Sequence, residues 1–372
     1  MSRASTVLYH KFKRVPWFLL CLICITASLG FAMLYSAANG ALHPWCLPQM
    51  IRFSFGLGVM FTIAMIPLNL WLRLAYVSYG ISIILLVAVH LFGDIGMGAQ
   101  RWLDLGILKI QPSEVAKITT ILALARYFHR FPPHKHTSLL FIAVPMAMIA
   151  VPLALILKQP NLGTATLLGG ICVWMMFASG MHRRYFVFGL IAIAVAAPVA
   201  WQTMHDYQKR RVMTFLNPSA DPLGDGYNIT QSIIAIGSGG LTGRGFTQGS
   251  QTQLDFLPEK QTDFIFTVLA EELGFLGGAL LLCTYTAMII SIIGMAYHSA
   301  SLFGMLIAHG IAAMLSLHLL INTGMVMGML PVVGIPLPLL SYGGSIMLSI
   351  QIAFGLVMNV WVHRDEKLTF YG

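Results

Sequence analysis

The sequence predicts an all-α, polytopic membrane protein, a bundle of about ten transmembrane helices. Of its 372 residues, 57% are hydrophobic and only 9% are charged, whereas roughly 25% of residues are charged in soluble domains. The mean hydropathy is +0.78. Apolar runs near the roughly 20 residues that a helix needs to cross a bilayer recur along the whole chain. A transmembrane barrel would instead show strands that alternate apolar and polar residues.

Ten such apolar runs follow one another. They lie approximately at residues 17–37, 50–68, 71–92, 112–128, 138–157, 162–180, 185–204, 264–295, 302–327 and 339–362. We therefore expect a single ten-span membrane domain over residues 1–372. Residues 205–262 would form a long extracytoplasmic loop between the seventh and eighth spans.

The distribution of Lys and Arg predicts the orientation of these spans. Twelve of the 22 lie on the side that holds both chain ends, in short loops; eight lie on the other side, five of them in the long loop. Cytoplasmic loops carry an excess of basic residues, so we expect both termini in the cytoplasm. The same bias explains most of the net charge of +9, and no nucleic-acid partner is expected. The first span is long for a signal peptide and should be an uncleaved anchor.

Three connections on the outer side carry most of the unusual residues. The first, residues 93–113, is rich in glycine and contains Arg101, Trp102 and Asp104; the second, residues 157–165, reads LKQPNLGTA. The third is the long loop, and a connection of that length is usually functional or disordered. Its segment NITQSIIAIGSGGL includes an apolar stretch, so we expect it to be ordered and to lie in the interface or re-enter the bundle. The glycines of residues 237–245 lack the spacing of a phosphate-binding loop and predict turns.

Charged residues inside the apolar runs are candidate functional residues. An ionisable side chain at mid-bilayer costs roughly 2.5–3.5 kcal/mol on insertion scales and normally faces a cavity or a partner. Glu114 and Lys117 are three residues apart at the start of the fourth span, on one helical face. They either neutralise each other or serve the function. Arg52, near the outer end of the second span, could simply extend to the interface.

The stretch FLPEKQTDFIFTVLAEELG, residues 256–274, places acids at the start of the eighth span. Pro258 predicts a turn and Thr262 a helix N-cap, which would put Asp263 in the first helical turn at the outer membrane boundary. Asp263 would either stabilise the helix dipole or carry out proton chemistry. Because a single helix cannot direct both Asp263 and Glu272 at one small site, Asp263 is the better candidate.

Glu271 and Glu272 lie deeper in the same span. We expect them to hold the bundle together or to pair with Arg52 or Lys117. The glycines and prolines of residues 328–344 interrupt helical regularity between the last two spans. Non-helical backbone at membrane depth persists only where it is buried or lines a cavity, so this segment predicts a wall of a substrate cavity or a hinge.

Four long motifs carry a resemblance to a known family. They are QRWLDLGILKIQPSEVAK (residues 100–117), GSGGLTGRGFTQGSQTQLDFLPE (237–259), LPEKQTDFIFTVLAEELG (257–274) and GMLPVVGIPLPLLSYGGS (328–345). Together they resemble the SEDS family of shape, elongation, division and sporulation proteins. PVVGIPLP and QGSQTQLDFLPE are more similar to the branch that determines rod shape than to the division branch.

The resemblance implies a ten-span protein of the bacterial inner membrane that polymerises lipid II into peptidoglycan glycan strands during cell elongation. It implies a class B penicillin-binding protein, a transpeptidase, as partner, and a divalent cation, Mg²⁺ or Mn²⁺, as cofactor with ligands unknown. Asp263 would be catalytic, and Trp102, Glu114 and Lys117 would be required. The family commonly has an acid where this chain has Asn161, so any role of that acid is weakened or reassigned here.

Glycan growth requires a base and a group that stabilises the departing pyrophosphate. We hypothesise that Asp263, its pKa raised by partial burial, takes the proton of the acceptor hydroxyl. Arg101, Lys117 and Lys260 would stabilise the pyrophosphate, and Glu114 would position Lys117. The alternatives are a flippase that transports lipid II and a scaffold that only activates its partner. The one-sided placement of Asp263, Trp102 and Arg101 favours the enzyme.

Overall fold

Helices occupy all ten predicted positions in the computed structural model, which describes residues 11–96, 99–104, 106, 109–132, 139–204, 206–217 and 224–368. The ten are α2 (Trp17–Ala37), α3 (Cys46–Met65), α4 (Leu68–Phe92), α5 (Pro112–Arg130), α6 (Leu139–Lys158), α7 (Leu162–Ala178), α8 (Arg183–Thr203), α12 (Ile265–Tyr297), α13 (Leu302–Val326) and α14 (Gly344–Val362). Ser138, the expected start of the fifth span, lies outside the described residues.

Seven helices in the described part of the chain are long and apolar enough to cross a membrane: α2, α3, α4, α6, α12, α13 and α14. α7 is a shorter apolar helix, and α5 begins with the buried ion pair of Glu114 and Lys117. The chain is thus a membrane protein with a mostly helical bundle, as predicted.

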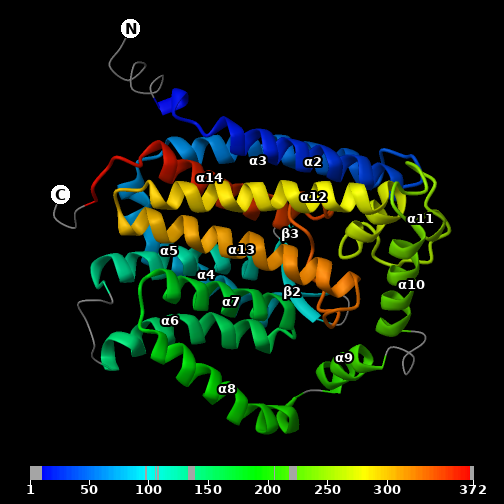
Figure 1. Ribbon diagram of the computed structural model, residues 1–372. Helices are drawn as coiled ribbons and strands as arrows, with labels where there is room; N and C mark the ends of the chain where they lie inside the picture. The colour runs from blue at the N-terminus through cyan, green and yellow to red at the C-terminus, as the bar shows by residue number, and fades with distance from the viewer. Residues whose placement is uncertain are drawn as a thin grey trace.

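The long helices run side by side, with the start of α2 and the end of α14 at one end of the bundle (Figure 1). At the opposite end lie the short helices α9 (Asp206–Leu216), α10 (Asp225–Ser238) and α11 (Ser250–Gln253), together with the strands. α13 packs against α12, α7, α5 and α14, while α14 packs against α3. The first and last of the ten helices therefore begin and end on one side of the bundle, and the described part of the long connection lies on the other (Figure 1).

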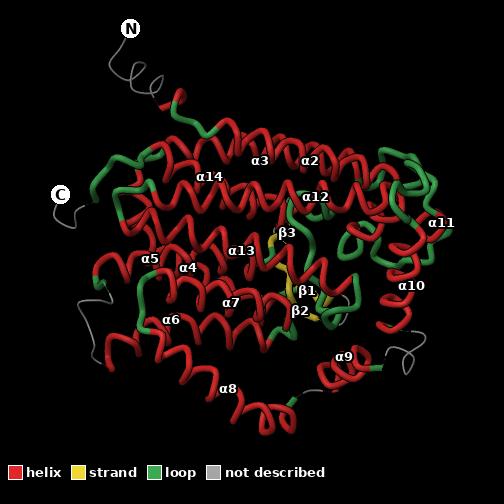
Figure 2. The backbone as a smooth tube through the Cα atoms, viewed as in Figure 1, coloured by secondary structure: helices red, strands yellow, loops and turns green. Residues whose placement is uncertain are grey.

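A small antiparallel sheet, not predicted from the sequence, occupies the first outer connection (yellow in Figure 2). Its strands are β1 (Asp94–Gly96), β2 (Ala99–Asp104) and β3 (Lys109–Ile110). Trp102 is paired with the residue at position 94, and Asp104 with Lys109. The sheet gives Arg101 and Trp102 a fixed place at the end of the bundle that also holds α9, α10 and α11 (Figure 1).

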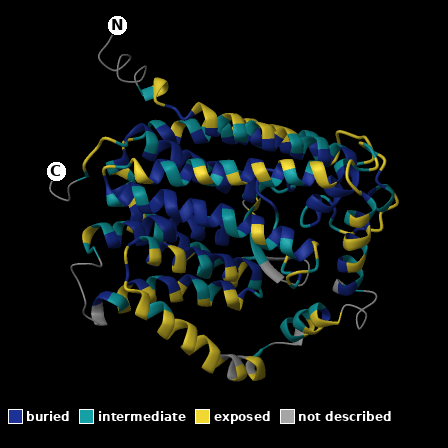
Figure 3. Cartoon of the chain, viewed as in Figure 1, coloured by how far each residue is buried: buried dark blue, intermediate teal, exposed yellow. Residues whose placement is uncertain are grey.

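Burial divides the helices into a central and a peripheral group (Figure 3). α13 and α14 are mostly buried, as expected for helices surrounded by other helices. α8 exposes large apolar side chains such as Phe188, Leu190 and Ile193, and it lies along the edge of the molecule. Because these side chains are apolar, this exposed face is suited to acyl chains.

The long connection is largely helical in its described part. This confirms the prediction that the NITQSIIAIGSGGL segment is ordered. That segment forms most of α10, which packs against α12 and α13. The buried Ser232 hydroxyl lies 2.7 Å from Thr267 Oγ1 on α12 and donates to the carbonyl of Val326, at 2.8 Å. Positions 205 and 218–223 lie outside the described residues.

α12 is broken at Gly274, where φ is 66° and ψ is −163°. The main-chain groups that the break releases bond to the glycine-rich segment, residues 239–245. Arg244 and Gly245 donate to the carbonyls of Glu271 and Glu272, at 3.0 and 3.1 Å, and Phe275 donates to the carbonyl of Gly240, at 2.9 Å. A Cβ at position 243 would lie 2.0 Å from the Glu272 carbonyl, so this crossing requires glycine. Gly239, Gly240, Gly243 and Gly245 thus lie in turns and loops, as predicted, whereas Gly237 lies inside α10, so the prediction of a turn is wrong there.

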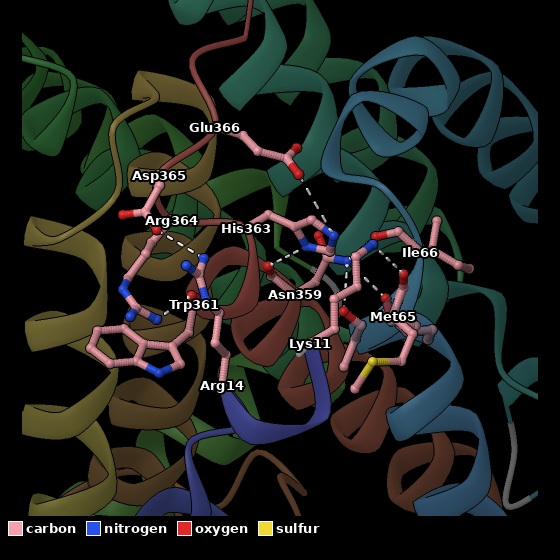
Figure 4. A network of polar contacts seen from close by, with 12 residues as sticks. Lys11, Arg14, Met65, Ile66, Asn359, Trp361, His363, Arg364, Asp365 and Glu366 are labelled. Carbon is pink, nitrogen blue, oxygen red and sulfur yellow. Dashed lines mark hydrogen bonds and ion pairs between the residues drawn. The ribbon is translucent and has the colours of Figure 1, made fainter. Parts of the chain in front are cut away.

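Polar contacts also join the two ends of the described chain (Figure 4). Arg14 forms an ion pair with Asp365, with Nη1 and Oδ2 2.8 Å apart. The buried Asn359 amide on α14 donates to the carbonyls of Ile63, Ala64 and Ile66 at the end of α3, the first at 2.9 Å. The carbonyl of Ile63 also accepts from the amide of Ile66, at 3.3 Å, whereas the Asn359 amide supplies a donor to the carbonyls of Ala64 and Ile66, where the helical pattern of hydrogen bonds ends.

Candidate active site

Asp263 lies in a turn that directly precedes α12. The helix begins at Ile265 with Phe264 as its N-cap residue, and no side chain caps it. The expectation that Thr262 is the N-cap is therefore wrong: its hydroxyl lies 3.2 Å from the carbonyl and 3.1 Å from the carboxylate of Glu259. Asp263 thus lies outside the first helical turn, on a turn that the Glu259 to Thr262 contacts shape.

The Asp263 side chain is half-buried at this turn. One carboxylate oxygen faces Gly334, where an added Cβ would lie 3.2 Å from Oδ2. Burial, followed by the nearby negative charge of Glu259, raises the pKa of Asp263 to about 6, and the positive charges of Arg211 and Arg101 oppose this rise. A carboxylate with such a pKa is mostly ionised at neutral pH and still basic enough to accept a proton.

Two arginines on different extramembrane elements supply the positive charge near Asp263. Arg101 lies on β2, and its guanidinium donates to the carbonyls of Gln159, at 3.4 Å, and Pro160. Arg211 lies on α9 in the long connection. The sequence singled out Arg101, whereas Arg211 was only one basic residue among several in the long loop.

Trp102 neighbours Arg101 on β2 and is half-buried. Lys260 is buried, and its ammonium is used within the turn that follows α11. It donates to the carbonyl of Thr252, at 2.8 Å, and forms an ion pair with Asp255, at 2.6 Å. Although Lys260 is near Asp263 in sequence, its charge is therefore neutralised locally.

Glu114 and Lys117 belong to a buried polar group that we call the Lys117 cluster: Glu114, Lys117, His318 and Ser349. The Lys117 ammonium lies 2.8 Å from Glu114 Oε1 and 3.0 Å from His318 Nε2, and Ser349 Oγ lies 2.9 Å from Glu114 Oε2. The pair shares one helical face, as predicted. The Lys117 side chain is only 1% exposed, which separates it from any water-filled groove.

His318 connects the Lys117 cluster to the segment beside Asp263. Its Nδ1 lies 3.1 Å from the carbonyl of Pro336, which can only accept a hydrogen bond. The proton is therefore on Nδ1, and Nε2 accepts a hydrogen bond from the Lys117 ammonium. Pro336 is two residues from Gly334, so the cluster fixes the segment that faces the Asp263 carboxylate.

Glu271 and Glu272 fasten the long connection to α12. Glu271 accepts hydrogen bonds from the main chain of Gln251, at 2.8 Å, and from the amide and hydroxyl of Thr252, at 3.1 and 2.7 Å, at the start of α11. Glu272 accepts from the hydroxyl of Ser36 on α2. The two acids thus hold the bundle together, and the alternative pairing with Arg52 or Lys117 is wrong. The Arg52 guanidinium instead stacks on Tyr342, 4.9 Å from the ring centre.

Asn161, found where the resemblance expects an acid, caps α7. Its Oδ1 accepts from the amide of Thr164, at 3.3 Å. An aspartate would make the same cap, so this position is structurally equivalent in the two cases.

Three polar residues near Asp263 escaped the sequence analysis: His318 and Asn322 on α13, and Ser341 between α13 and α14. The available signal was the spacing of His318 and Asn322. They are four residues apart within an apolar span and therefore lie on one helical face.

A divalent cation at this site would need oxygen ligands near Asp263. The described residues contain no group of three or more His, Cys, Asp or Glu side chains that could hold a metal. They do place two carboxylates, Asp263 and Glu259, within electrostatic reach of each other. Mg²⁺ is commonly held by one or two carboxylates plus substrate phosphates and water, so Glu259 beside Asp263 fits a ligand of such an ion.

Fold and site together define a polytopic membrane protein with a candidate acid–base centre at one end of its helix bundle. The family model FTSW_RODA_SPOVE, described as "Cell cycle protein", matches residues 14–366. The chain belongs to this family, the SEDS family that its motifs resemble.

Relatives of known name point to the rod-shape branch. "Peptidoglycan glycosyltransferase MrdB" of Escherichia coli (strain K12) is 46% identical over 316 residues, 84% of each chain. A chain of the structure described as "Structural coordination of polymerization and crosslinking by a peptidoglycan synthase complex" has a TM-score of 0.84 and 31% identity, covering 95% of this chain and 99% of that one. The Thermus thermophilus rod shape determining protein RodA has a TM-score of 0.73 and 29% identity, covering 95% and 98%.

Proposed function

We propose that this chain is a peptidoglycan glycosyltransferase that polymerises lipid II into glycan strands for cell elongation, with Asp263 as its general base. The observation that carries the assignment to Asp263 is its position. Its carboxylate is half-buried at the end of a membrane span, beside Gly334 and within reach of the charges of Arg101 and Arg211. The relatives named as peptidoglycan glycosyltransferases support the reaction.

The reaction forms one bond to the anomeric carbon of a donor sugar and breaks another. The acceptor hydroxyl attacks that carbon, its proton passes to an oxygen of Asp263, and the lipid pyrophosphate departs with the electrons of the broken C–O bond. A positioned base contributes typically 100- to 10,000-fold to such a rate. A pKa of about 6 supports this role, because the base is ionised before the reaction.

Arg101 and Arg211 are the proposed partners of the departing pyrophosphate. Both lower the pKa of Asp263, so their positive charges act on the same small region. Charge that develops on a leaving group is best stabilised by preorganised cations. Lys117 and Lys260 are buried and paired within the protein, so we now assign them to support of the site. Trp102 would line the substrate groove beside Arg101.

A divalent cation, Mg²⁺ or Mn²⁺, is part of the proposal. Glu259 would hold it together with phosphate oxygens of the substrate, which leaves the Asp263 carboxylate free to act as the base. When bound, it would neutralise charge on the pyrophosphate.

The proposed partner is a class B penicillin-binding protein, the transpeptidase that crosslinks the new strands. The structurally similar chain in a peptidoglycan synthase complex supports it. We also propose that both termini lie in the cytoplasm and that the long connection lies outside the inner membrane. The excess of Lys and Arg on the side of the termini supports this orientation.

Polymerisation of labelled lipid II by the purified protein with its partner tests the proposal. Glycan chains from the wild type and none from Asp263→Asn would support it. Movement of lipid II across a vesicle without glycan formation would support the flippase, and neither activity would support the scaffold. Wild-type turnover by Asp263→Asn would remove Asp263 from the role of base.

A further inference from the structure

Three consecutive main-chain carbonyls in the turn that carries Asp263 are bonded to a separate part of the chain. The carbonyl of Gln261 accepts from the amide of Tyr342, at 2.8 Å. The carbonyl of Thr262 accepts from the Ser341 hydroxyl, at 2.6 Å, and that of Asp263 from Asn322 Nδ2, at 2.9 Å. The main chain around Asp263 is thus held by the residues between α13 and α14 and by α13 itself.

Asn322 connects the turn with the segment that faces the Asp263 carboxylate. It is fully buried on α13, and its Nδ2 also donates to the carbonyl of Ile335, at 2.7 Å. Both neighbours of this nitrogen are carbonyl oxygens that can only accept, so the amide must direct its NH₂ group toward them. Ile335 directly follows Gly334, the residue against Asp263 Oδ2. One side chain therefore fixes both the main chain of Asp263 and the backbone opposite its carboxylate.

Ser341 makes a second connection of the same kind. Its side chain is buried, and the hydroxyl accepts from the amide of Leu337, at 2.7 Å, while it donates to the carbonyl of Thr262. The hydroxyl thus links the loop before α14 to the residue that precedes Asp263. Both of its hydrogen bonds are made within the protein.

We propose that Asn322 and Ser341 are positioning residues, which place the Asp263 carboxylate for proton transfer by holding the main chain of the turn. This inference rests on the proposed function of Asp263. A base must lie within hydrogen-bond distance of the proton it takes, and a displacement of about 1 Å can cost 100-fold in rate. The effect therefore falls on the chemical step, while the groups proposed to bind the pyrophosphate keep their places.

The experiment must separate positioning from a general loss of stability. Asn359 supplies a matched control, because it is equally buried and donates from the same Nδ2 atom to main-chain carbonyls at the opposite end of the bundle. The variants are Asn322→Leu and Asn359→Leu. A second pair is Ser341→Ala, which removes the hydroxyl, and Ser341→Thr, which keeps it. Each is purified with its partner and measured for lipid II polymerisation and for Tm.

We expect Asn322→Leu to lower kcat about 10- to 100-fold with KM changed less than about threefold. Asn359→Leu should lower Tm by about as much as Asn322→Leu does, but its kcat should stay within about threefold of wild type. Ser341→Ala should lower kcat, and Ser341→Thr should recover most of it. Equal losses of kcat at positions 322 and 359, or an unchanged kcat in Ser341→Ala, would overturn the inference. If neither asparagine variant folds, the kcat values of Ser341→Ala and Ser341→Thr test the positioning role. Turnover by Asp263→Asn would instead overturn the proposed function, which separates the two failures.

Discussion

The Asp263 turn and the Lys117 cluster both place ionisable groups against an apolar bundle, but they treat the charges differently. In the Lys117 cluster, the ammonium contacts an acid and an imidazole within 3.0 Å, and the acid also contacts a hydroxyl. At the turn, the Asp263 carboxylate is half-buried, its pKa is raised, and one of its oxygens faces Gly334.

The difference separates two reasons for a charge in a membrane protein. The cluster uses its charges on one another and fixes a segment of chain, whereas the turn leaves a basic oxygen ready for a proton. Charged groups are costly to bury in either place, so the free-energy cost of burial does not by itself identify a catalytic residue. The group that each charge contacts distinguishes a structural charge from a candidate catalytic one.

Removal of the Asp263 carboxylate should have the largest effect. Asp263→Asn keeps the size of the side chain but cannot take a proton, so we expect a loss of polymerisation of about 100- to 10,000-fold. Tm should not fall, because the substitution removes a partly buried charge. Turnover and thermal unfolding of the purified variant measure both. Lys260→Met is the control, because the Lys260 ammonium is already paired with Asp255. An equally large loss of polymerisation in Lys260→Met would contradict the distinction between paired charges and the Asp263 carboxylate.

Breaking the Lys117 cluster should lower the free energy of unfolding. Lys117→Met leaves the Glu114 carboxylate buried without its cation, which typically costs about 3–5 kcal/mol. The double variant Glu114→Gln/Lys117→Met removes both charges and should recover much of that loss. Unfolding in detergent or lipid, followed for the single and double variants, tests this. If the single and double variants were equally destabilised, Glu114 and Lys117 would not neutralise each other.

A methyl group at position 334 should disturb the turn more mildly. Gly334 has φ of +67°, and its added Cβ would lie 3.2 Å from Asp263 Oδ2. A left-handed conformation costs a non-glycine residue roughly 1–2 kcal/mol, and the contact displaces the carboxylate. We expect Gly334→Ala to reduce kcat by about tenfold. Gly58→Ala, at a position with open space, is the control and should leave turnover unchanged.

The pH dependence of turnover should report the charges around Asp263. The protonated carboxyl is inactive as a base, so activity should fall below about pH 6, approaching tenfold per pH unit. Glu259 raises the pKa of Asp263, and Arg101 and Arg211 lower it. The acid limb should therefore move to lower pH in Glu259→Gln and to higher pH in Arg101→Gln. If the acid limb of the pH profile lay at the same pH in the wild type, Glu259→Gln and Arg101→Gln, the titrating group would not be Asp263.

Hydrophobic runs predicted the positions of the ten long helices because each must satisfy its own main chain in a bilayer. The first span was predicted from Trp17 to Ala37, as found. The last was placed five residues too early, since α14 begins at Gly344. Leu339 and Leu340 are apolar and buried, as in a helix, yet the main chain of Ser341 and Tyr342 bonds to Gln49 and to Gln261 in the Asp263 turn.

The site was only partly readable from the sequence. Asp263 and Arg101 stood out because charged residues are rare in this chain. Asn322 and Ser341 did not, because an amide or a hydroxyl in an apolar run is common and its meaning depends on the carbonyl that it reaches. The partners of Asn322 are 59 and 13 residues away in the chain. Such partners follow from packing, which local patterns do not encode.

The bond between Asn359 and the end of α3 has a consequence for biogenesis. During synthesis, the carbonyls of residues 64 and 66 are made almost 300 residues before the Asn359 amide that donates to them. A ribosome that stalls before α14 would leave them exposed at the start of the bundle. The hydrogen bonds at this end of the bundle can therefore be completed only after the last helix has been synthesised.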